Sequence, residues 1–142
     1  MSTVVDFYLR TPQPAATLAE TYRENLRARG VDPVRYYIHF RPADSEDREG
    51  SLAQFGVEPT VIASVQPPRG QGDAELEAAA LRTAHAVGAE MVAFHDGTPM
   101  LSYREGVAHL APEDREYYEE HVLPGFEGRV EWGEILPWMN GK

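Results

Sequence analysis

The order of strand-like and helix-like segments constrains the fold of this chain more than any other feature. Four segments show the alternation or the β-branched content of strands: residues 3–10, 34–42, 59–68 and 90–95. Two others carry apolar side chains at helical spacing and end at a glycine: residues 12–29 and 73–87. The resulting order, β-α-β-β-α-β, predicts an α+β protein built as a ferredoxin-like sandwich. In that fold two helices cover one face of a four-stranded antiparallel sheet.

The chain continues beyond this unit with a further set of elements. Asp96-Gly97 is a strong turn signal, so a hairpin strand is expected next to the fourth strand. Pro112 and the acids after it predict the start of a short helix, which is followed by a tail. We therefore expect one globular domain over residues 1–142, with the core sandwich at 1–97 and a C-terminal extension at 98–142.

Net charge is the strongest feature of the composition. The 142 residues include 13 basic and 23 acidic side chains, which gives a formal charge of −10. Such a protein repels nucleic acid and suits a basic protein partner, because complementary charge accelerates association. The acids are concentrated near the C-terminus, where residues 113–134 hold eight acids against two arginines. The polar stretch 42–57 contains further acids, and we expect it to be an exposed loop. High charge also favours solubility by itself.

Other parts of the composition exclude several classes of function. The chain has no cysteine, which rules out disulfides, thiolate metal sites and a thiol nucleophile. The five histidines show none of the spacings of common metal motifs, so we expect no metal and no cofactor. No apolar run approaches the ~18 residues that cross a bilayer, and the N-terminus shows no signal-peptide pattern. A cytoplasmic protein without membrane contact is therefore expected.

The sheet face turned away from the helices is one candidate site. If the apolar strand residues face the helices, alternation places a polar set on the opposite face. Its functional members are Tyr8, Arg10, Tyr37, His39, Arg41, Gln66 and His95. His39 and His95 are candidate acids or bases, with Tyr8 to orient a substrate. The candidate ligand-binding residues are Arg10, Tyr37, Arg41 and Gln66. A solvated face, or one covered by the C-terminal segment or a second copy of the chain, accounts for the same pattern.

The short helix after Pro112 is the other candidate site. Its candidate partner-binding residues are Glu113, Glu116, Tyr117 and Glu120. A tyrosine surrounded by acids is typical of a contact surface for a basic protein. The alternative is a solvated helix whose tyrosines pack inward.

We therefore expect a small, acidic, non-catalytic protein that binds a more basic protein partner, as an inhibitor or immunity-type protein does. The sequence contains no complete catalytic constellation, which supports this preference. The alternative is a small-molecule enzyme, or a domain that binds a small anionic ligand, using the open face of the sheet. A homodimer that pairs two such faces would enclose the same site.

Overall fold

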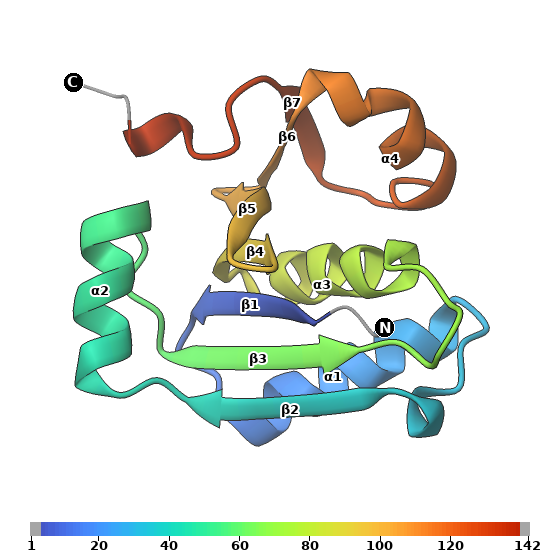
Figure 1. Ribbon diagram of the computed structural model, residues 1–142, viewed down its shortest axis with the longest axis horizontal. Helices are drawn as coiled ribbons and strands as arrows, with labels where there is room; N and C mark the ends of the chain where they lie inside the picture. Colours follow the sequence, from blue (N-terminus) through green and yellow to red (C-terminus); the bar gives the residue numbers. More distant parts are fainter. Residues whose placement is uncertain (1–3, 140–142) are drawn as a thin grey trace.

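One sheet of seven strands forms the centre of the protein, and four α-helices surround it in the part of the chain that the computed structural model describes, residues 4–139 (Figure 1). The strands are β1 (Val5–Arg10), β2 (Tyr37–Pro42), β3 (Val61–Gln66), β4 (Glu90–His95), β5 (Thr98–Arg104), β6 (Val107–Leu110) and β7 (Arg129–Trp132). The α-helices are α1 (Ala15–Ala28), α2 (Ser45–Phe55), α3 (Ala74–Val87) and α4 (Arg115–His121). Short 3-10 turns occupy η1 (Pro33–Arg35), η2 (Pro112–Asp114) and η3 (Pro137–Met139).

The predicted α+β class is confirmed, but the sheet differs from a four-stranded ferredoxin-like sandwich. Its strand order is β2-β3-β1-β4-β5-β6-β7. Every neighbouring pair is antiparallel except β6 and β7, which run parallel because η2 and α4 connect them as a crossover. Strands β5, β6 and β7 therefore extend the same sheet beyond β4.

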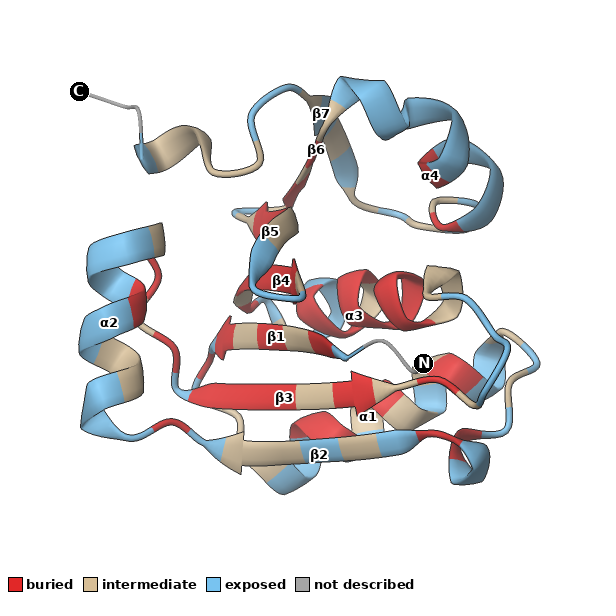
Figure 2. Cartoon of the chain, in the orientation of Figure 1, coloured by how far each residue is buried: buried red, intermediate tan, exposed pale blue. Residues whose placement is uncertain are grey.

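Helices α1 and α3 lie together on one face of the sheet and bury the main core. From α1, Leu18, Tyr22 and Leu26 are fully buried, as the helical spacing of these residues predicts. The small residues of α3 allow this helix to approach the sheet closely, and its exposed side chains are few (Figure 2). The Tyr22 hydroxyl donates to the Leu76 carbonyl at 3.1 Å, which satisfies a buried polar group and ties α1 to α3.

Residues 45–55 form a helix, so the expectation of an exposed loop over 42–57 was wrong. Asp44 accepts from the Asp47 amide at 2.8 Å, and the Asp47 side chain accepts in return from the Asp44 amide at 3.1 Å. This reciprocal capping box fixes the start of α2. In Figure 1 the helix stands beside the ends of β1 and β3, and Phe55 packs against Phe94 of β4 with ring centroids 4.7 Å apart.

The segment after β7 crosses back over the sheet and joins α2. The Trp138 indole donates to the Phe55 carbonyl at 2.8 Å, and the Arg104 guanidinium lies 3.9 Å from its ring centroid. Gly56 ends α2 in the left-handed region, with φ 74°, and a Cβ at that position would stand 2.6 Å from Trp138 Cδ1. Only glycine combines this backbone conformation with such a close approach.

Strand β4 buries both of its faces, and this overturns part of the predicted face assignment. Alternation along residues 90–95 predicts Val92 and Phe94 toward α1 and α3, and Met91 away from them. Instead Tyr8 is paired with Val92 across the sheet, so Val92 and Phe94 share the face of Tyr8 and α2. Met91 packs into the core under the helices. The faces predicted for β1, β2 and β3 agree with the observed register.

Candidate functional site

The surface of α4 and η2 carries the densest exposed acid of the described chain. Glu113, Glu116 and Glu120 are exposed, and Tyr117 is 39% exposed among them. Neither Glu113 nor Glu116 forms an ion pair within residues 4–139, and Glu120 approaches only His121, at 3.9 Å. Figure 2 shows this part of the chain almost entirely in the colour of exposed residues. The predicted partner-binding residues therefore lie together on one accessible surface, which we call the α4 surface.

Tyr118 anchors this helix to the rest of the protein. It is 3% exposed, its ring lies 6.5 Å from that of Trp132, and its hydroxyl donates to the Met100 carbonyl at 3.5 Å. The adjacent Tyr117 ring packs edge-on against Tyr118 at 5.3 Å. Tyr118 therefore packs the helix against the sheet, while the Tyr117 ring remains accessible to solvent.

Beneath the α4 surface lies Glu77 of α3, a buried acid that sequence reasoning missed. It is 4% exposed, its Oε2 accepts from the Tyr117 hydroxyl at 3.3 Å, and its Oε1 has no hydrogen-bond partner in the described chain. Burial raises the pKa of Glu77 to about 7, against the lowering effect of the neighbouring tyrosine hydroxyls. The nearby carboxylates of Asp73 and Asp114 also raise this pKa. Glu77 is therefore poised to change charge near neutral pH.

His95 does not belong to the open sheet face, because strand β4 has the opposite register to the predicted one. It is paired with Val5, and its Nε2 lies 3.3 Å from Asp73 Oδ2, on the side of α3. Burial raises the pKa of Asp73, while His95 acts in the lowering direction. The structure therefore separates His95 from Tyr8 and His39, so the three predicted catalytic residues do not share a site.

The remaining residues of the open face do gather on β1, β2 and β3. Tyr37 is paired with Gln66 across β2 and β3, and the Tyr37 and His39 rings stack with centroids 6.4 Å apart. The Arg41 guanidinium is already held by Asp47 of α2, at 2.9 Å, and this contact lowers the pKa of Asp47. Tyr8 packs against Phe94, with ring centroids 4.7 Å apart, and burial raises the pKa of its hydroxyl. His39 is exposed, and within residues 4–139 it forms no ion pair with a carboxylate.

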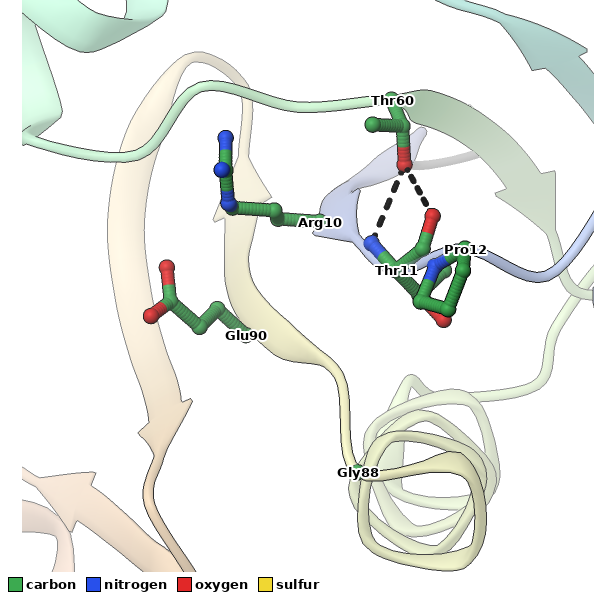
Figure 3. A pocket seen from close by; sticks show the side chains of 6 residues that line it. All are labelled: Arg10, Thr11, Pro12, Thr60, Gly88 and Glu90. Atoms are coloured by element: carbon green, nitrogen blue, oxygen red, sulfur yellow. Dashed lines mark hydrogen bonds between the residues drawn. The ribbon is translucent and has the colours of Figure 1, made fainter.

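Arg10 lies away from this group and lines a cavity of about 390 Å³ (Figure 3). The other lining residues are Thr11, Pro12, Thr60, Gly88 and Glu90. Arg10 Nη1 donates to Glu58 Oε1 at 3.1 Å, and Arg104 Nη2 donates to Glu90 Oε1 at 3.2 Å. Glu90 and Thr60 are therefore site residues that the sequence analysis did not identify, since their position depends on pairing between distant strands.

The described residues contain neither a cluster of metal ligands nor a membrane-spanning helix. Within residues 4–139, no three histidine or carboxylate side chains come close enough together to hold a metal ion. None of the helices in that range has both the length and the apolar content to span a bilayer.

Comparisons with known proteins assign this chain to no family. The chain is an α+β protein, and no protein-family model and no curated protein sequence matches it. A chain of the CdiA-CT/CdiI toxin and immunity complex from Burkholderia pseudomallei is matched with a TM-score of 0.43 and 15% sequence identity. The match covers 66% of this chain and 93% of that chain. A likeness at this level supports no inference about function.

Proposed function

We propose that this protein is a small acidic binding protein that recognises a more basic protein through its α4 surface, as an inhibitor or immunity-type protein does. The observation that carries the proposal is the set of exposed carboxylates around Tyr117, of which Glu113 and Glu116 form no ion pair within the described residues, whereas Glu119 is paired with Arg115. Carboxylates without intramolecular cations are available to a partner, and their field attracts basic proteins over several ångströms.

The foundation of α4 also supports this proposal. An effective contact surface presents an aromatic side chain from a rigid base, because less conformational freedom is then lost on binding. Tyr118 supplies that base by its burial, and Tyr117 supplies the accessible ring. Aromatic residues at the centre of an interface contribute most of its binding energy, while surrounding charges govern the association rate.

The geometry favours this proposal over an enzyme that works on the open sheet face. A catalytic site requires aligned proton donors and acceptors within hydrogen-bonding reach. His95 lies on the other side of the sheet, Arg41 is paired with Asp47, and His39 is exposed.

The proposal is tested by native mass spectrometry of the tagged protein, recovered gently from its own cells. We expect a stoichiometric basic protein to accompany the wild type. The variant Glu113→Gln/Glu116→Gln/Glu120→Gln should lose it, because three charges leave the surface while its shape is kept. A recovered mass of one or two copies of this chain alone would contradict the proposal.

A matched variant distinguishes the α4 surface from general acidity. Glu24, Glu46 and Glu49 are exposed acids on α1 and α2, and their replacement by Gln removes the same charge elsewhere. This control should retain the partner. If it loses the partner as completely as the α4 variant, net charge rather than the α4 surface governs binding. With the partner purified, association with the wild type should slow steeply as salt is added, and the α4 variant should show a weaker dependence.

A further inference from the structure

The cavity beside Arg10 lies outside the α4 surface and has the dimensions of a ligand site. Its volume of about 390 Å³ falls within the range of small-molecule pockets. Arg10 and Glu90 are the end residues of β1 and β4, and the other lining residues follow β1, precede β3 or follow α3 directly (Figure 3). A pocket built from sheet and helix termini is largely preformed, so binding requires little ordering of the chain.

The charged groups of this cavity have opposite sign and are held apart. Arg10 and Glu90 are cross-strand partners on β1 and β4, yet no ion pair joins them in the described chain. Each is held by a different neighbour, Arg10 by Glu58 and Glu90 by Arg104. Within residues 4–139 both hydrogen bonds of Arg10 use Nη1, so Nε and Nη2 remain for a ligand. Glu90 is held through Oε1, which leaves Oε2.

The neutral wall has its polar groups satisfied and adds no competing charge. The Thr60 hydroxyl accepts from the Thr11 amide at 3.0 Å and donates to the Thr11 carbonyl at 2.8 Å (Figure 3). Gly88 ends α3 with φ 66°, and a Cβ there would meet open space. The carbonyl end of a helix carries partial negative charge, so this end of the cavity favours a cation.

We propose that this cavity binds a small zwitterion of the amino-acid type. The ligand carboxylate lies against the free guanidinium edge of Arg10, in the geometry that arginine offers to carboxylates. The ligand ammonium lies toward Glu90 and the end of α3. Arg10 and Glu90 then contact the two opposite charges of one molecule. A simple acid would leave Glu90 without a ligand cation, and a simple amine would leave Arg10 without a ligand anion. Because Arg10 is half exposed, affinity is expected in the millimolar range, at about 1 mM.

The proposal is tested by nuclear magnetic resonance titration of the full chain with each standard L-amino acid, at up to about 10 mM, which saturates a site of millimolar affinity. We expect a subset of them to shift the backbone signals of Thr11, Thr60 and Gly88 in a saturable manner. The matching carboxylic acid without its ammonium group, and the matching amine without its carboxylate, should each bind at least ten-fold more weakly. No saturable shift with any amino acid, or equal binding of the simple acid, would overturn the proposal.

Two charge variants and a blocking variant make the test specific. Arg10→Gln and Glu90→Gln should each weaken binding at least ten-fold, while Arg23→Gln, which changes an arginine on α1, should leave it unchanged. Gly88→Asn keeps the left-handed conformation that asparagine tolerates and places a side chain in the cavity. This variant should abolish binding even if a charge variant fails to fold. Unchanged affinity in Gly88→Asn or in Arg10→Gln would refute the site. None of these outcomes depends on the α4 surface.

Discussion

The buried carboxyl of Glu77 should make the stability of this protein fall as the pH rises from about 4.5 toward neutrality. The change that reveals this effect is Glu77→Gln, which retains the shape and an oxygen to accept from Tyr117 but removes the charge. In the wild type, ionisation of Glu77 places a charge among the rings of α4, with Asp73 and Asp114 nearby. In the variant no such charge can form.

The magnitude follows from the pKa of the buried carboxyl. Its pKa is raised from 4.5 to about 7, and each unit corresponds to about 1.4 kcal/mol. Because the folded pKa lies above the unfolded one, the contribution of Glu77 is fully present below pH 4.5 and is lost as the pH rises to about 7. The wild type should therefore lose about 2–3 kcal/mol of unfolding free energy, relative to the variant, between pH 5 and pH 8.5.

Urea denaturation, followed by tryptophan fluorescence at several pH values from 5 to 8.5, measures this difference. Every other ionisable group is common to the two proteins, so the gap between the two curves isolates Glu77. Glu49→Gln, an exposed acid on α2, serves as the control and should run parallel to the wild type. If the Glu77→Gln curve also runs parallel to the wild type, the reasoning about the buried carboxyl is refuted.

Three further changes test other parts of the structure. Asp44→Ala removes the capping box of α2 and should cost about 1 kcal/mol in chemical denaturation, whereas Glu46→Ala should have little effect; equal costs would contradict the role of the cap. Trp138→Ala removes the contact between the C-terminal segment and α2 and should cost about 2 kcal/mol, with faster proteolytic cleavage of that segment; an unaltered cleavage rate would show that the indole does not hold it. Replacing His39 and Arg41 together by Ala should leave co-purification of the proposed basic partner unchanged, and its loss would move the contact surface to the open sheet face.

The sequence predicts the fold where alternation is clear and fails where both faces of an element are apolar. In β1 and β2 polar and apolar residues alternate, so their faces are predicted correctly. In β4, Met91 and Val92 are both buried, one toward α3 and the other toward α2. Alternation cannot distinguish these two faces, because the pattern is apolar in both registers.

Helix α2 and strand β6 were not predicted for a different reason, because the sequence signals for them are local and weak. Helix α2 has a capping box in the letters DSED, but few apolar residues face the sheet, so its composition is typical of a loop. Strand β6 has four residues and follows a tight turn at Glu105, whose φ is 54°. A four-residue strand is too short for alternation to predict which of its faces is buried or which strand it pairs with.

The two candidate sites differ in how far the sequence could define them. The exposed acids of α4 are adjacent in the chain, so composition alone locates them. Glu77 resembles any acid in the first turns of a helix, and only the packing of α4 over α3 buries it. The pair of Arg10 and Glu90 depends on a register between strands that lie far apart in the sequence, which no local pattern encodes.

The position of β1 inside the sheet, between β3 and β4, has a consequence for how this protein folds. Val5 is paired with Val65 on one side and with His95 on the other, so β1 finds neither neighbour among nearby residues. The hairpin of β4 and β5, by contrast, closes over the short turn at Asp96-Gly97. Long-range pairing slows folding because the loop entropy is lost before the contacts form. The C-terminal hairpins should therefore form early, and the insertion of β1 between β3 and β4 should be the late, rate-limiting event that completes the sheet.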